Sequence, residues 1–425
     1  MENEGEHRKT MDLESNNPAH ASLSTPLLKG VAVSNKVWLL IAGFVIFNVI
    51  FWPLITVFVI LKNTSGSSSS ITDDDYVPVP VMTTIFPKNY TATGVRQGSD
   101  GNILVTGATG PPTLENSPET HPCLYYGTLE QLYTNDYQSS LYHVVPVFPN
   151  ETVTASMFYG PNTPYYDPRI GEGNILAVGA YAYAEYPYQC SFIYEGPPSG
   201  GGNFTKIIIN NRIINGTYVD EVALTVAHSV MGDYVVGNVY YASNQKISYG
   251  LIYNRFRGDY MLIERGRSTT LYGIWQNGGY NSTKYTIVGG HSDFDDNNGT
   301  SIEVAFIENF DALTKNFTDY RTYYYLNNMS LATHFQGITG AEGGFNLASE
   351  VLPEYVPSFA YIPVEADGSF GNATWIPIES ISPYQTTSDT VVGDFVFGVY
   401  YTTSYTFNGQ FRSYVYNVSE ALARG

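Results

Sequence analysis

The chain has 425 residues and a formal net charge of −19. Such an excess of negative charge argues against binding to nucleic acid or to anionic lipid headgroups. Only 14% of the residues are charged, and the 37 tyrosines and 40 glycines favour short strands and turns over helices. The two cysteines are too few for a zinc framework.

The first element predicted along the chain is a transmembrane helix over residues 37–61, with the sequence VWLLIAGFVIFNVIFWPLITVFVIL. This apolar run contains no charge, lies between Lys36 and Lys62, and exceeds the roughly 20 residues that cross a bilayer as a helix. A cleaved signal peptide, the alternative, has a shorter apolar core closer to the N-terminus. Residues 1–36 are polar and are expected to be a disordered cytoplasmic tail.

Sequons for N-glycosylation occur only after this apolar run. Their distribution predicts a type II, single-pass membrane glycoprotein whose C-terminal part faces the cell exterior or the lumen of an endomembrane compartment. Asn63 starts a sequon too close to the membrane for modification. The candidate acceptors are Asn89, Asn150, Asn203, Asn215, Asn281, Asn298, Asn316, Asn328, Asn372 and Asn417.

A repeated pattern follows the Ser- and Asp-rich linker of residues 62–76. One phrase, a strand ending in Val-Gly or similar and then tyrosines, occurs as NILAVGAYAY (174–183), DYVVGNVYY (233–241) and DFVFGVYY (394–401), among other copies. A second phrase follows each copy, for example CLYYG (123–127) and SFIYEG (191–196), and a third and a fourth complete the pattern. Four short strands that recur about every 50–70 residues are typical of the blades of a β-propeller.

Six copies of the pattern predict a six-bladed β-propeller-like domain over residues 77–425. The last copy stops after two strands, and residues 77–97 are expected to supply the outer strands of the same blade, which removes exposed sheet edges. A β-sandwich is the alternative, but a sandwich gives no reason for a four-strand repeat. The predicted fold class is therefore all-β, a propeller-like ectodomain carried on one N-terminal transmembrane helix.

Residues 90–417 resemble the extracellular repeats known as HAF-type repeats, in which a G-x-x-V-G-x-Y strand precedes a G-F-x-Y strand. The His-Ala-Phe core of those repeats is absent from this chain, and the matched residues are structural. The resemblance implies a propeller-like surface domain and does not imply an activity.

The histidines of the ectodomain form no recognisable catalytic motif. His228 and His334 fall at comparable places of the fourth phrase, within AHSVMG and THFQG, which favours a structural role in the repeat. The chain has neither a G-x-S-x-G elbow nor an H-E-x-x-H helix. An acidic protein always contains pairs of carboxylates that could serve glycoside hydrolysis, so their presence does not indicate that the protein is a glycosidase. No catalytic residue is predicted.

The best candidate for a metal site is the segment HSDFDDNNGTSIE, residues 291–303. Asp293, Asp295 and Asn297 alternate there as ligands do in calcium-binding loops. Gly299 stands one place late for such a loop, and Val304 occupies the position of the expected acid. A solvated acidic turn is the simpler interpretation. No cofactor is therefore predicted, and calcium is the single candidate.

Cys123 and Cys190 begin the second phrase of two neighbouring copies. An oxidising compartment permits a disulfide between them, provided that their Cα atoms approach within about 7 Å. Two free, buried thiols are the alternative.

These observations favour a binding or adhesion module for a carbohydrate or protein ligand. The first alternative is a membrane-anchored, glycan-acting enzyme of the secretory pathway, and the second is a structural surface-coat protein. The discriminating feature is the axis of the propeller. Converging carboxylates and arginines there would favour the enzyme, whereas tyrosines and backbone alone would favour the binding module. The residues identify neither the ligand nor the oligomeric state.

Overall fold

The computed structural model describes residues 81–99, 101–110, 120–214, 217–295, 300–352, 356–379, 382, 385–402 and 410–420. The predicted tail, transmembrane helix and linker, residues 1–76, lie outside the described residues. No helix in the described part of the chain is long and apolar enough to cross a membrane. The prediction of a single-pass membrane protein is therefore not supported.

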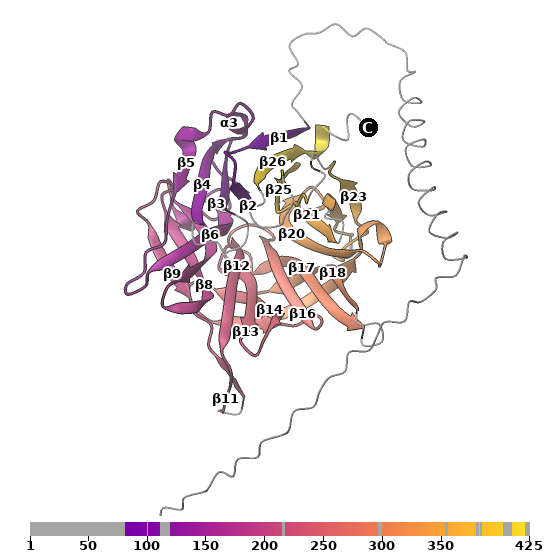
Figure 1. The fold of residues 1–425 in the computed structure, drawn as a ribbon. Helices are drawn as coiled ribbons and strands as arrows, with labels where there is room; N and C mark the ends of the chain where they lie inside the picture. The colour runs from indigo at the N-terminus through magenta and orange to yellow at the C-terminus, as the bar shows by residue number, and fades with distance from the viewer. Residues whose placement is uncertain are drawn as a thin grey trace, which may run out of the picture. The chain divides into compact units, whose positions relative to one another are not determined.

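The described residues form an all-β, propeller-like domain in which the sheets surround a common axis (Figure 1). In three of the four-stranded sheets the chain runs outward from the axis, strand by strand. These sheets contain β2(Tyr90–Gln97), β3(Asn102–Thr109), β4(His121–Thr128) and β5(Leu141–His143); β16(Ser268–Gln276), β17(Lys284–Asp295), β18(Thr300–Asp311) and β19(Asn316–Tyr323); and β20(Ala332–Ala341), β21(Gly344–Leu352), β22(Val356–Pro363) and β23(Thr374–Pro377).

The fourth four-stranded sheet joins the two ends of the described chain. It contains β24(Thr390–Val392), β25(Phe395–Tyr401), β26(Phe411–Asn417) and, as its outer strand, β1(Met82–Ile85). β1 pairs with β26 in antiparallel fashion, so that Met82 lies opposite Tyr416. This pairing covers an edge that would otherwise present unpaired backbone groups.

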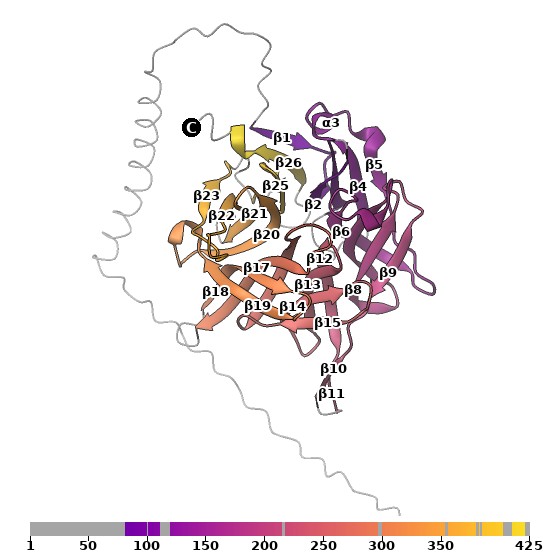
Figure 2. The ribbon, with the colours of Figure 1, turned by 180° about the vertical axis from the view of Figure 1, so that it is seen from behind.

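The remaining strands form one eight-stranded sheet and a separate ribbon. The large sheet contains β6(Val153–Asn162), β7(Ile175–Tyr183), β8(Tyr186–Gly196), β9(Asn203–Ile207), β12(Val222–Met231), β13(Tyr234–Tyr241), β14(Asn244–Asn254) and β15(Tyr260–Ile263). A single parallel pair, Leu224 with Gln189, connects its two halves. The ribbon of β10(Arg212–Ile214) and β11(Thr217–Asp220) extends away from the sheets (Figure 2).

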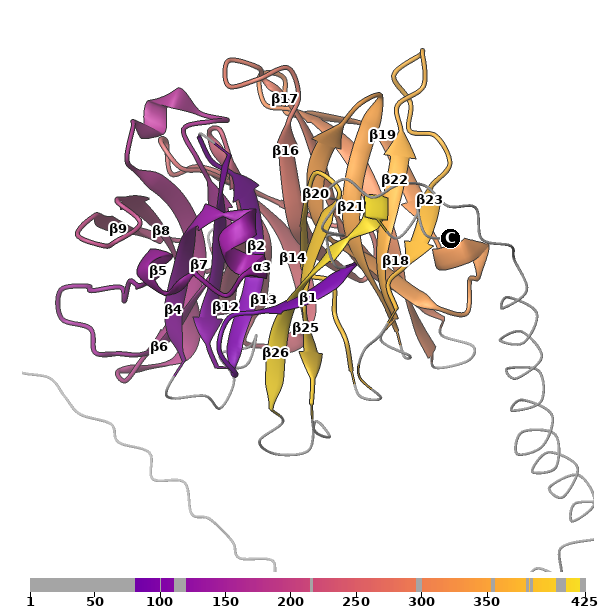
Figure 3. The same cartoon turned by 90° about the horizontal axis from the view of Figure 1, so that it is seen from above.

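The prediction of a six-bladed propeller is therefore wrong as stated. Four sheets of four strands are separate blades, whereas the strands of two further predicted blades share one sheet. The strands nearest the axis are β2, β6, β12, β16, β20 and β24, and each of them packs against the next, with β24 packing against β2. Figure 3 shows the sheets from the side, with their strands running along the axis.

Apolar side chains fill the space between neighbouring sheets. Val288 and Ile307 of one sheet pack against Phe335, Leu347 and Ala360 of the next, and all five are buried. Because both faces of such a sheet are covered, its inner strands are nearly continuous apolar runs, as in β7. The few helical turns are short and lie in the connections: α3(Leu129–Tyr133), η2(Gln138–Ser140), η3(Pro168–Ile170) and η4(Tyr325–Asn327).

Candidate functional site

The strands nearest the axis contain β-bulges that turn polar side chains toward it. The pairing register skips one residue near the middle of five of these strands, namely Thr93, Tyr159, His228, Tyr272 and Gln336. Each of these side chains is partly exposed, although both of its sequence neighbours are buried. Bulges re-aim a side chain in this way and occur frequently beside active sites.

Asp389, directly before β24, is a sixth residue that lies in a bulge beside the axis. The amide of Asp389 donates to the carbonyl oxygen of Phe397, and Thr390 pairs with the same phenylalanine, so that two residues oppose one. Asp389 is partly exposed between two buried neighbours. We call these six residues the axial ring: Thr93, Tyr159, His228, Tyr272, Gln336 and Asp389.

Glycines that follow the bulges bring the inner strands close together. A Cβ atom on Gly94 would lie 1.9 Å from the carbonyl oxygen of Tyr159 on the next strand. A Cβ atom on Gly160 would lie 2.3 Å from the carbonyl oxygen of His228. At these distances the Cβ atom of any other residue would overlap the neighbouring carbonyl oxygen. Only glycine therefore allows the inner strands to lie this close together around the axis.

A histidine between two glutamates lies beside the axial ring. In His334, Nδ1 is 3.5 Å from Oε2 of Glu303, and Nε2 is 3.4 Å from Oε2 of Glu350. Gln336 Nε2 lies 2.8 Å from His334 Nε2 and 3.1 Å from Glu350 Oε2. Burial lowers the pKa of His334, but the two glutamates outweigh burial and raise it to about 10. The two glutamates therefore favour the protonated imidazole over the neutral one.

Two carboxyl groups of this region have pKa values shifted in opposite directions. Burial, and then the charge of Glu350, raises the pKa of Asp389 to about 8. Burial acts against ionisation of Glu303 as well, but the neighbouring His334 lowers its pKa overall. At neutral pH the first group is a carboxylic acid and the second is a carboxylate. Such a separation of two carboxyl groups assigns an acid and a base in many hydrolytic sites.

Aromatic rings form one wall of the axial ring. The ring of His228 lies 4.8 Å from that of Tyr159 and 4.6 Å from that of Tyr272. Tyr272 in turn stacks on His334 at 5.4 Å. Burial, and then the charge of His334, lowers the pKa of His228 to about 3, so this imidazole is neutral. Its Nε2 lies 3.1 Å from Nδ2 of Asn238.

A small cavity lies among the residues of the axial ring. Thr93, His228, Tyr272 and Gln336 line a cavity of about 20 Å³ together with Arg96. This volume holds about one water molecule. A larger ligand does not fit into this cavity and would therefore contact the ring on the side that faces away from the cavity, which is its outer side.

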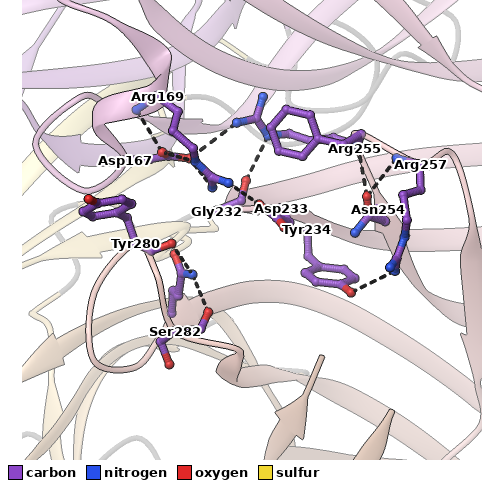
Figure 4. A network of polar contacts seen from close by, with 12 residues as sticks. Asp167, Arg169, Gly232, Asp233, Tyr234, Asn254, Arg255, Arg257, Tyr280 and Ser282 are labelled. Atoms are coloured by element: carbon purple, nitrogen blue, oxygen red, sulfur yellow. Dashed lines mark hydrogen bonds and ion pairs between the residues drawn. The ribbon is translucent and has the colours of Figure 1, made fainter. Parts of the chain in front are cut away.

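A second group of charged residues joins the loops that follow β6, β12 and β14 (Figure 4). Arg169 donates to both carboxylate oxygens of Asp167, over 2.8 and 2.9 Å, and to Asp233 over 2.7 Å. Nη2 of Arg255 lies 3.4 Å from Asp167, whose side chain is fully buried. Burial raises the pKa of Asp167, but the hydrogen bonds of Arg169 lower it overall. We call these four residues the loop network; its charges are paired, which suits a structural role.

Two of the three predicted calcium ligands lie in a described strand. Asp293 and Asp295 belong to β17, where they pair with Ile302 and Thr300 of β18, and Asn297 lies outside the described residues. Among the described residues, no group of three or more His, Cys, Asp or Glu side chains could hold a metal ion.

The two cysteines are free thiols, which is the second of the two alternatives that the sequence left open. Cys123 lies in β4 and Cys190 in β8, each in the third strand from the axis. Burial raises the pKa of the Cys123 thiol to about 12 and that of the Cys190 thiol to about 11, so neither is reactive at neutral pH.

Most of the predicted glycosylation sites that the structure describes are on the surface. Asn417 differs, because it is 9% exposed and its Oδ1 accepts a hydrogen bond from the amide of Glu420. Asn215 and Asn298 lie outside the described residues. The exposed sites are Asn89, Asn150, Asn203, Asn281, Asn316, Asn328 and Asn372.

Sequence reasoning did not find the axial ring. His228 lies in a bulge, whereas His334 lies two residues before one, so the two histidines are not equivalent as predicted. The sequence does contain a signal for these bulged residues, namely a bulky or polar residue directly before glycine in the fourth phrase. It occurs as Thr93-Gly94, Tyr159-Gly160, Tyr272-Gly273 and Gln336-Gly337.

No family model and no curated protein matches this chain. Among solved structures, it is similar to a Dyadobacter fermentans protein of unknown function, with 9% identity and a TM-score of 0.46 over 80% of this chain and all of the other. A Trypanosoma rangeli sialidase shares 7% identity with a TM-score of 0.43, over 79% of this chain and 56% of the sialidase. A β-1,3-galactosidase of family GH43 shares 10% identity with a TM-score of 0.34, over 76% of this chain and 90% of the galactosidase. These values describe a distant likeness and carry no information about substrate.

Proposed function

We propose that the protein is a glycan-acting hydrolase whose active site is the outer side of the axial ring. The observation that carries this proposal is the cluster beside the axial ring, in which Glu303 and Glu350 flank His334 and the pKa values of Asp389 and Glu303 are shifted in opposite directions. Glycoside hydrolysis needs such a pair, one group to protonate the leaving oxygen and one to attack the sugar or activate water.

The environment of each carboxyl group assigns its role. Asp389 retains its proton up to about pH 8 and would donate it to the glycosidic oxygen as that bond to the anomeric carbon breaks. Glu303 is ionised, and its side chain is 28% exposed, against 9% for Glu350. Glu303 would therefore act as nucleophile or base toward the sugar, with water completing the hydrolysis. His334, between the two glutamates, is a positioning residue.

The composition of the ring supports a sugar substrate. Tyr159, His228 and Tyr272 present partly exposed aromatic rings, which suit the apolar faces of sugars. Thr93 and Gln336 add hydrogen-bonding groups at the same ring. The two thiols lie outside the ring and are unreactive, so the ring offers no cysteine nucleophile.

The test is release of a chromophore from a panel of aryl glycosides by the full-length protein. We expect turnover of at least one glycoside, and loss of that turnover in Asp389→Asn and in Glu303→Gln. Asp233→Asn serves as the matched control, because this aspartate belongs to the loop network and is 39% exposed. Tight binding of a sugar without turnover would instead favour a carbohydrate-binding module. Turnover that persists in both ring variants would refute the proposed site.

A further inference from the structure

Arg96 is a buried cation that crosses the axis. Its side chain starts on β2, which packs against β6 and β24. Its Nη2 nevertheless donates to the carbonyl oxygen of Ile274 on β16 over 3.2 Å and lies 3.4 Å from Oγ of Ser229 on β12. The residue is 3% exposed.

The partners of this guanidinium are neutral. Nη1 donates to the carbonyl oxygen of Val95 over 3.1 Å, and the Trp275 ring lies 5.7 Å from Cζ. Nε has no hydrogen-bond partner among the described residues. Burial lowers the pKa of Arg96, which means that the loss of hydration destabilises the charged guanidinium. A buried charge without a counter-charge is strongly destabilising.

Other arginines that are largely buried have the counter-charge that Arg96 lacks. Arg255 contacts Asp167 and Glu195, and Arg265 binds both oxygens of Glu308. The neutral surroundings of Arg96 are therefore not the general way in which this protein buries an arginine.

Arg96 is one of the residues that line the cavity of about 20 Å³ at the axial ring. Ser229 and Thr390 also line it. The Oγ of Ser229 accepts from Arg96, and Oγ1 of Thr390 accepts from the amide of Val95. Each hydroxyl can still donate its own hydrogen to an acceptor in the cavity. The site thus combines a positive charge with two further donors.

We propose that this cavity binds a chloride ion, held by Nε of Arg96 and by the hydroxyl groups of Ser229 and Thr390. The size of the cavity restricts the ligand to a monatomic anion, because Gly94 and Gly160 keep the surrounding strands too close for sulfate or phosphate. The ion would neutralise the guanidinium and stabilise the folded chain by mass action. This proposal is independent of the hydrolase activity.

The first test is thermal unfolding of the full-length protein in sodium gluconate, with chloride replacing gluconate at constant ionic strength. We expect Tm to rise with chloride and then level off, and to rise with bromide as well. Arg96→Gln should abolish this rise, whereas Arg257→Gln, which removes a 57% exposed arginine, should leave it unchanged. Equal Tm values of the wild type in chloride and gluconate would overturn the proposal.

A second measurement does not depend on a foldable Arg96 variant. In crystals of the wild-type protein grown with bromide, the proposal predicts an anomalous scattering peak in the cavity, within hydrogen-bond reach of Arg96 and Ser229. Ser229→Ala should lower the occupancy of that peak. An ordered water molecule with no anomalous signal at this position would contradict the proposal.

Discussion

Two regions of this molecule, the loop network and the vicinity of the axial ring, differ in how their carboxyl groups are paired. In the loop network, Asp167 is fully buried, and Arg169 and Arg255 both contact it. Beside the axial ring, Glu303 and Glu350 share one imidazole, that of His334, and Asp389 keeps its proton to about pH 8. A network with paired charges stabilises loops, whereas a surplus of carboxyl groups provides both an acid and a base.

Replacing the acid of the axial ring should have the largest effect. We expect Asp389→Asn to lower kcat/KM for a hydrolysed glycoside by about 10²–10⁴-fold, because general acid catalysis contributes that much. The folded chain should not lose stability, since asparagine replaces a group that is already neutral at pH 7. Steady-state kinetics and thermal unfolding measure the two effects separately. A loss of activity that merely follows a loss of folded protein would contradict the assigned role.

Breaking the loop network should affect stability instead. Asp167→Asn leaves the buried Arg255 with Glu195, which is 45% exposed, as its one charged partner, and this should lower the free energy of unfolding by about 3 kcal/mol. Asp233→Asn removes a partly exposed partner of Arg169 and should cost at most about 1 kcal/mol. Chemical denaturation measures both values. Equal costs would show that the burial of Asp167 is not what matters.

The close approach of the inner strands predicts a smaller loss. Gly94→Ala places a methyl group 1.9 Å from the carbonyl oxygen of Tyr159, so the strands must move apart. Such overpacking typically costs about 1–3 kcal/mol. Gly101→Ala is a matched control for steric contact, because a Cβ atom there meets nothing within 4 Å, although its positive φ adds a modest cost of its own. If Gly94→Ala lowers the free energy of unfolding by no more than Gly101→Ala does, the close approach of the inner strands at Gly94 would be refuted.

His334 should make stability depend on pH. Its pKa is raised from 6.5 to about 10, so its contribution is complete below pH 6.5 and is lost as the pH rises through about 10. The difference in unfolding free energy between the wild type and His334→Gln should therefore shrink across that window. Denaturant titrations at several pH values provide the measurement. A difference that is constant from pH 6 to 10 would mean that folding does not raise the pKa of His334.

Much of the strand pattern could be predicted from the sequence, because each strand is a short apolar run between turn residues. The phrases at 174–183, 233–241 and 394–401 correspond to β7, β13 and β25. The union of two predicted blades could not be predicted, since it depends on the single pair Leu224 with Gln189. The proposed site could not be predicted from the sequence either. Glu303 and Glu350 come from two different strands, and only the closed ring brings both of them to His334 on a third strand.

The measurement closest to the central claim is a titration of the carboxyl carbons of Asp and Glu by ¹³C NMR in the wild-type protein. The resonance that Asp389→Asn removes identifies Asp389 and needs no knowledge of the substrate. Our account predicts that this resonance titrates near pH 8. Titration near the ordinary value of 3.8 would leave the axial ring without an acid at neutral pH and would contradict the proposed hydrolase.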